Sequence, residues 1–327
     1  IACLLLMVSF SLFKFFVAFV VLPYLALIPE ISISFKDRIR LTTISSYFSI
    51  LGIILASGVP AVMLSENFTI SYISLIFGII VLLSFIIVFF TIRERNFALK
   101  RPKTFSFKRA IVETFKNKTE DIYIFAYLAF QFGFYLFLSS IYYWIAVLVL
   151  PESPNPAQYV GIFELVAVIF AVIFSPILVK YSEKHGKKRA FILFTLLFGL
   201  AAMLLSIVGL VPIHNNFYLA LALTAFAGFG LTAYFILPNA IISDIIDEDE
   251  TRTGFRREGM YFGVQGFLER IPSALSGLAL GAWLSFLYFP THDPIFIRLL
   301  EILCGITFIV TAILFIFVPL KEGIIEK

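Results

Sequence analysis

An all-α, polytopic membrane protein is the fold class predicted for this chain of 327 residues, and three observations predict it. Hydrophobic residues make up 61% of the chain and charged residues 14%, which leaves too little polar surface to face water. The apolar residues gather in runs of about 20 or more, the length that a helix needs to cross a bilayer. Membrane β-strands would be shorter and would alternate polar with apolar residues, so helices are favoured.

Nine apolar runs are expected to be membrane-spanning helices. They cover residues 2–29, 42–64, 70–92, 122–150, 157–180, 188–212, 217–243, 259–288 and 296–320. Most of the 25 Lys and Arg residues lie in every second connection between these runs. The positive-inside rule therefore places those connections, and the C-terminus, in the cytoplasm. The net charge of +4 is explained by this topology and indicates no nucleic-acid partner.

The long basic connection at residues 93–121 is predicted to be a cytoplasmic linker, with three spans before it and six after it. Three and six helices are what remain of a six-plus-six protein that lacks its first three helices. The chain also begins at Ile1 inside an apolar run, which suggests an N-terminally truncated sequence with nine of twelve helices. Residues 1–92 would then be helices four to six of an N-terminal half, and residues 122–327 a C-terminal six-helix half.

Three parts of the chain resemble the glycoside-pentoside-hexuronide:cation symporter family, the melibiose-permease-like branch of the major facilitator superfamily. Residues 23–30 (Pro-Tyr-Leu-Ala-Leu-Ile-Pro-Glu), with 37–41 and 48–52, are similar to the family's fourth helix, the next loop and the start of the fifth helix. Residues 93–95 resemble the exit from the sixth helix, and 244–259 the loop between the tenth and eleventh helices. The resemblance implies two six-helix halves that handle a solute between them near the membrane midplane.

Two departures from the family pattern concern charged residues. Val21 stands where melibiose permease has an aspartate, and Ser45 and Ser46 stand where many relatives place an arginine. Both changes remove charges associated with sugar and cation binding. A coupling ion, Na⁺ or H⁺, is therefore implied by the resemblance alone.

Arg270 lies about eleven residues into its predicted span, where a charge is costly unless it is paired or hydrated. Pro272 has no N–H, which frees the carbonyl of Leu268. Gln265 and Glu269 are one helical turn apart and are expected to share a polar seam. We expect Arg270 to bind an anionic substrate group or to substitute for a coupling cation; the alternative is an arginine that pins helices together.

Further candidates come from polar side chains inside the apolar spans. Lys14 lies near the middle of the first span and is an intramembrane cation. For Tyr24 and Trp144 the alternative is an interfacial aromatic belt. The predicted substrate-binding residues are Arg270, Lys14, Tyr24, Gln131, Trp144 and Gln265.

Charged residues of both signs follow the seventh span, and a shorter charged stretch follows the first. Such mixed charges suit ion pairs that two conformations make and break, although a solvated hydrophilic loop is the alternative. The predicted gating residues are Asp37, Arg40, Asp244, Asp247, Arg256, Arg257 and Glu258.

The sequence thus predicts a secondary active transporter in the cell membrane, a cation-coupled symporter of a sugar or related small solute that works by alternating access. A lysolipid or lipid transporter of the same branch and a non-transporting membrane scaffold are the alternatives. No phosphate-binding loop, His-Glu-x-x-His or nucleophile elbow is present, so no enzyme is expected. We expect a monomer with membrane lipids and a small-molecule solute as partners, and neither cofactor nor metal.

Overall fold

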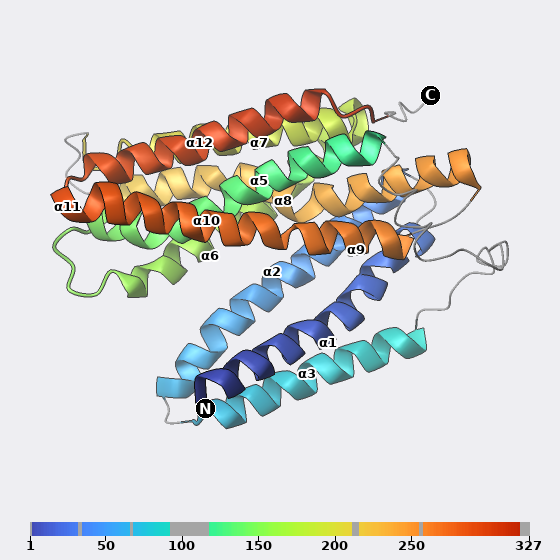
Figure 1. Cartoon of the computed structure of the whole chain (residues 1–327), viewed down its shortest axis with the longest axis horizontal. Coiled ribbons are helices and arrows are strands. Elements are labelled where there is room, and N and C mark those ends of the chain that lie inside the picture. The colour runs from blue at the N-terminus through green and yellow to red at the C-terminus, as the bar shows by residue number, and fades with distance from the viewer. Residues whose placement is uncertain are drawn as a thin grey trace. The chain divides into compact units, whose positions relative to one another are not determined.

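The computed structural model describes residues 2–31, 35–65, 68–91, 118–210, 216–254 and 258–320. Within these ranges the chain is helical apart from short connections and contains no strand (Figure 1). Among the described residues, seven helices are long and apolar enough to cross a membrane, judged by length and composition. The predicted polytopic helical bundle is confirmed.

The helices follow the predicted spans closely in most of the chain. In order they are α1 (Ala2–Ile31), α2 (Phe35–Ser65), α3 (Ile70–Thr91), α5 (Lys118–Trp144), η2 (Ile145–Val149), α6 (Ala157–His185), α7 (Lys187–Leu205), α8 (Asn216–Thr253), α9 (Glu258–Leu268), α10 (Arg270–Trp283), η3 (Leu284–Tyr288), α11 (Phe289–Thr291) and α12 (Ile295–Ile316). The labels η2 and η3 mark single turns of π-helix, which end α5 and α10.

The chain divides into two compact units. The first combines Ile1–Thr43 with Pro102–Lys327 and contains α1 and α5 to α12; the second is Ile44–Arg101 and contains most of α2 and all of α3. Nearly all side chains of α3 are exposed, as expected for an apolar helix that contacts lipid. Most of the predicted linker at residues 93–121 lies outside the described residues, so that boundary stays a prediction.

Helices α5 and α12 pack antiparallel in the first unit. The ring centroids of Tyr123 and Phe315 are 6.1 Å apart near one end, and those of Phe130 and Phe308 are 5.6 Å apart one to two turns further along. These rings are fully buried. The aromatic contacts therefore fix α5, which carries much of the site described below, against α12.

Helices α7 and α12 approach each other through two glycines and lie side by side in Figure 1. A methyl group placed on Gly199 would stand 2.8 Å from the carbonyl oxygen of Gly305, and one on Gly305 would stand 2.7 Å from the carbonyl oxygen of Gly199. Neither position has room for a side chain. Small residues of this kind let membrane helices touch through their backbones.

The charged segment after the seventh span is helical at first, which corrects the prediction of a loop from Asp244 onward. Helix α8 continues to Thr253 because Ile245 and Ile246 keep its buried face apolar for another turn. Gly254 then ends the helix with a φ of 72°, a conformation that favours glycine, and its N–H donates to the carbonyl of Glu250 at 2.8 Å.

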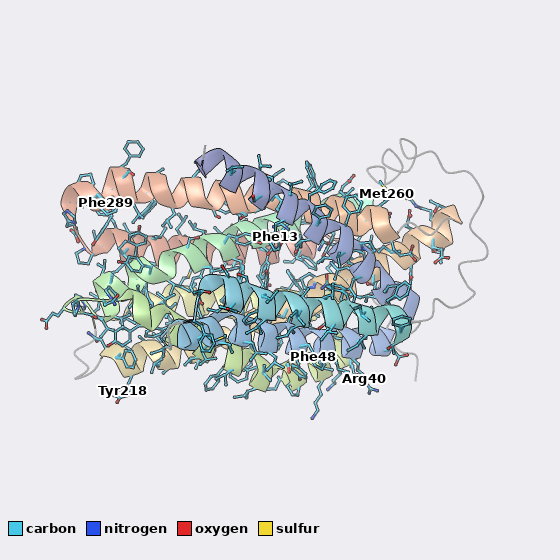
Figure 2. All side chains as sticks on the ribbon, turned by 90° about the horizontal axis from the view of Figure 1, so that it is seen from below. Phe13, Arg40, Phe48, Tyr218, Met260 and Phe289 are labelled. Atoms are coloured by element: carbon cyan, nitrogen blue, oxygen red, sulfur yellow. The ribbon has the colours of Figure 1, made fainter. Side chains whose placement is uncertain are left out.

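The predicted span at 259–288 lies within one membrane-length span, Glu258–Thr291, that is irregular at Glu269, where the backbone angles stay helical (φ −58°, ψ −21°). Helix α9 ends at Leu268, Glu269 lies in a turn, and α10 begins at Arg270. Met260 and Phe289 mark the two ends of this region in Figure 2. Pro272 explains the irregularity, because it has no N–H to donate to the carbonyl of Leu268.

Candidate functional site

A stripe of polar side chains runs along α5 inside the first unit. Tyr123, Tyr127, Gln131 and Tyr135 recur every four residues, so they lie above one another on one face of the helix. The first three are buried, and Gln131 has no exposed surface. A buried polar stripe within a membrane helix is costly unless its groups are hydrogen-bonded, and such stripes usually mark a solute pathway.

The stripe is tied to α8 and to the irregular span by hydrogen bonds. The hydroxyl of Tyr123 donates to the carbonyl of Pro238 at 3.1 Å and lies 3.4 Å from Oε1 of Gln265. The hydroxyl of Tyr135 donates to Oε1 of Glu269 at 3.0 Å. The structure therefore gathers groups from three helical regions into one polar cluster.

One acceptor in this cluster is left without a partner. Gln131 donates through Nε2 to the hydroxyl of Tyr127 at 3.0 Å, whereas its Oε1 has no hydrogen-bond partner among the described residues. Tyr234 of α8 also interacts with Gln131 and stacks on Phe134, with ring centroids 4.0 Å apart. A buried amide oxygen without a donor costs about 1–3 kcal/mol, which an O–H or N–H of a bound solute would recover.

Glu269 and Arg270 bring charge to the same cluster at the turn between α9 and α10. Glu269 interacts electrostatically with Tyr127, Tyr135 and Tyr234, and Arg270 interacts with the last two. The side chain of Arg270 is exposed, and in the described part of the chain no carboxylate lies within ion-pair distance of it. The cluster therefore offers a cation and several oxygen acceptors.

The structure places the other predicted substrate-binding residues differently. Tyr24 lies on α1, which packs against α8 and α9, and its side chain is 37% exposed. Lys14 belongs to α1, but its side chain lies outside the described residues. Trp144 is buried away from the stripe: its indole N–H donates to the carbonyl of Leu205 at 3.0 Å and its ring packs on Phe163.

A second polar region lies where α6 turns into α7, next to α8. Lys187 and Asp244 form an ion pair with a 2.7 Å distance between Nζ and Oδ2, and Nζ also donates to the carbonyl of Ala240 at 3.2 Å. The Lys187 side chain is only 3% exposed. Asp244, a predicted gating residue, thus neutralises a buried ammonium on a neighbouring helix.

Two further ion pairs lie in the first unit. Arg40 on α2 lies 3.6 Å from Glu183 on α6, and Arg252 lies 3.0 Å from Asp249 within α8. Figure 2 shows Arg40 and Met260 toward the end of the first unit opposite Phe289 and Tyr218. This end is the one predicted to face the cytoplasm.

The remaining gating predictions have mixed outcomes. Asp37 is exposed on the first turn of α2, Asp247 lies on α8 and is partly buried, and Glu258 is buried at the start of α9. Arg256 and Arg257 lie outside the described residues. The structure therefore brings Asp244 and Arg40 into ion pairs and leaves the two arginines untested.

Sequence reasoning missed several residues of both regions. Tyr123, Tyr127 and Tyr135 could have been found from their four-residue spacing with Gln131. The basic turn 184–189, which contains Lys187, could be recognised from the sequence by its likeness to a gate loop of the superfamily, although Lys187 was not among the predicted gating residues. Its pairing with Asp244 could not be predicted, because 57 residues separate Lys187 from Asp244 and their contact is tertiary.

Comparison with known proteins identifies the class to which this fold and these polar regions belong. Residues 2–322 match a family described as MFS/sugar transport protein, so the chain belongs to that family of major facilitator transporters. This confirms the resemblance inferred from the sequence, and membership of this family points to transport rather than to enzymatic catalysis.

The chain is similar in sequence to two curated proteins with different named roles. An uncharacterized symporter of Synechocystis sp. is 39% identical over 62 residues, which are 19% of this chain and 10% of the symporter. A candidate 2,3-dihydroxypropane-1-sulfonate exporter of Escherichia coli is 25% identical over 286 residues, which are 83% of this chain and 58% of the exporter. The chain thus spans little more than half the length of the second relative.

Proposed function

We propose that the chain belongs to a cation-coupled symporter that carries a sugar or a related small polyhydroxylated solute. The symporter works by alternating access. The observation that carries the proposal is the buried Tyr-Gln-Tyr stripe of α5, with the unpartnered Oε1 of Gln131 at its centre. Oxygen acceptors from Gln131 and Glu269 suit a solute rich in O–H donors, and tyrosine rings suit the apolar faces of a sugar.

Family membership and the symporter relative support the proposal at a coarser level. The matching family is described by sugar transport, and one relative is named a symporter. The irregular turn at Glu269 adds a structural reason, because Pro272 has no N–H to donate to the carbonyl of Leu268, which is then free to meet a solute or an ion.

The direct test is uptake by proteoliposomes that contain the full-length protein. We expect labelled sugars or polyols to accumulate when an inward Na⁺ or H⁺ gradient is imposed, and not without one. Movement of labelled lysolipids in place of sugars would replace this proposal by the lipid transporter. If neither solute class moves under any gradient, the protein is better explained as a non-transporting membrane scaffold.

The site itself is tested by Gln131→Leu. This variant removes the unpaired acceptor and replaces the amide by an apolar side chain of similar size. Loss of one solute hydrogen bond at a buried position should lower kcat/KM by about tenfold or more. Leu138→Ala is the matched control, because Leu138 is on the same helix with an exposed side chain. Equal kcat/KM in Gln131→Leu and wild type would remove the stripe from the pathway.

A second candidate substrate is a hydroxylated solute that carries an anionic group. Two observations favour it: Arg270 has no carboxylate partner in the described ranges, and one relative is named for a dihydroxypropane sulfonate. Arg270→Lys should then weaken the affinity for sulfonates, because a point charge replaces a planar fork, while neutral sugars are unaffected. If Arg270 instead substitutes for a coupling cation, Arg270→Gln should change mainly the dependence on Na⁺ or pH.

A further inference from the structure

Glu301 is a buried carboxyl group inside the α5–α12 interface, apart from both polar regions described above. Its side chain is 1% exposed, and it lies on the second turn of α12 opposite Ser140 of α5. Gly133 packs closely against Thr307 further along the same interface. The carboxyl group is therefore enclosed by two closely packed membrane helices.

The hydrogen bonds around Glu301 can be counted. The hydroxyl oxygen of Ser140 is 2.8 Å from Oε1 of Glu301 and 2.8 Å from the carbonyl oxygen of Phe137. A serine hydroxyl has one hydrogen and can donate to only one of these two acceptors. The second short contact needs a hydrogen from the other side, and the carboxyl group is the only one of the two acceptors that can carry one.

The other oxygen leads to the same conclusion. Oε2 of Glu301 is buried and has no hydrogen-bond partner among the residues that the structure describes. An ionised carboxylate with one bare oxygen in this setting would be an uncompensated buried charge, which is strongly destabilising. A neutral acid leaves only a carbonyl oxygen without a donor, at a much smaller cost.

Nearby charged groups do not offset such a charge. On α12 itself, Arg298 donates from its guanidinium to the carbonyl oxygens of Ser206 and Val208, and the buried Cys304 lies one turn beyond Glu301. Helix α7 carries its described cations at its first turn, where Lys188 donates to the carbonyls of Ile316 and Val318 at the far end of α12. From α5, the group that faces Glu301 is Ser140. In the described structure no cation is paired with the carboxyl group.

We propose that Glu301 is a proton-binding site: its carboxyl group holds a proton at neutral pH and donates it in a hydrogen bond to Ser140, which in turn donates to the carbonyl of Phe137. The bound proton joins α12 to α5, the helix that carries the polar stripe. This inference concerns a different interface from the proposed solute site and stands without it.

Infrared difference spectroscopy of the full-length protein in lipid nanodiscs tests the proposal. Wild type minus Glu301→Gln should show the carbonyl stretch of a protonated carboxylic acid at pH 7, apart from the amide and carboxylate bands. Ser140→Ala should shift that band, because the acid loses its acceptor. Glu152→Gln, at an exposed residue of the α5–α6 connection, is the control and should leave the band unchanged. A carboxylate band in place of the acid band would overturn the proposal.

Thermal unfolding across pH gives an independent readout. An unfolded glutamate is ionised at neutral pH, so unfolding of wild type releases the proton that Glu301 held. The unfolding equilibrium should therefore shift toward the unfolded state as pH rises, by up to about tenfold per pH unit for one proton. Glu301→Gln has no proton to release and should lose this contribution. The same pH dependence in both proteins would mean that Glu301 is ionised in the fold.

Discussion

The two polar regions of the first unit hold their polar groups in different ways. The α5 stripe has buried tyrosine and glutamine side chains that share hydrogen bonds and leave Oε1 of Gln131 without a partner. The Lys187–Asp244 region instead pairs a buried ammonium with a carboxylate at 2.7 Å. An unmet acceptor favours ligand binding, whereas a satisfied charge pair favours holding helices together.

From this contrast we expect the ion-pair region to contribute mainly to stability and the α5 stripe mainly to solute affinity. Changes in the ion-pair region should alter unfolding more than KM, and changes in the stripe should do the reverse. The substitutions below test this division, from the largest expected effect to the smallest.

Asp244→Ala should have the largest effect, because it removes the counterion of a buried ammonium. We expect the free energy of unfolding to fall by about 2–4 kcal/mol, less than for a fully buried pair since Asp244 is 26% exposed. Lys187→Met combined with Asp244→Ala should recover most of this loss, because the ammonium and its counterion are then removed together. Detergent unfolding curves of both variants measure the effect, and an additive double mutant would exclude direct coupling.

Tyr135→Phe should raise KM about tenfold with a smaller change in stability. The substitution removes the O–H that donates to Glu269 at 3.0 Å and so leaves that carboxylate less well oriented for a solute. Uptake kinetics over a range of solute concentrations separate KM from kcat. A large loss of stability with unchanged KM would show that the stripe stabilises the fold and does not bind the solute.

Trp144→Phe should cost about 1 kcal/mol of unfolding free energy and leave uptake unchanged. The variant keeps the ring against Phe163 but removes the N–H that donates to the carbonyl of Leu205. A clear rise in KM would instead support the prediction from the sequence that Trp144 binds the substrate.

Arg40→Gln should change the unfolding free energy by no more than about 0.5 kcal/mol, because Arg40 is 65% exposed and the pair with Glu183 spans 3.6 Å. Transport is the sharper measurement. A strong loss of uptake with unchanged stability would show that this weak pair acts as a gate. The difference in uptake from wild type should then be larger at low salt, where exposed charges are less screened.

The spans were predictable from the sequence because bilayer thickness fixes the length of an apolar run. The irregular turn at Glu269 was partly predictable, since Pro272 cannot donate to Leu268. The region after Asp244 was not, because buried isoleucines extend α8 through a stretch whose composition is that of a loop. The charged composition of this stretch predicts a loop, but the burial of its isoleucines stabilises a helix.

Pairings between helices were beyond sequence reasoning. The approach of Lys187 to Asp244 and of Ser140 to Glu301 depends on how the helices pack, and no local pattern encodes it. Glu301 was overlooked because it lies only a few residues inside the predicted span at 296–320, where a charged side chain usually reaches the interface. Its burial shows that depth along a helix does not decide which face of the helix a residue occupies.

The glycine contact between α7 and α12 has a mechanical consequence. Each backbone fills the space that a side chain of the other would need, so sliding one helix along the other would drive Met203 and Phe308 into the neighbouring main chain. Closely packed interfaces change between discrete arrangements and do not deform smoothly. We therefore expect α7 and α12 to move as one rigid body in any conformational change of this unit.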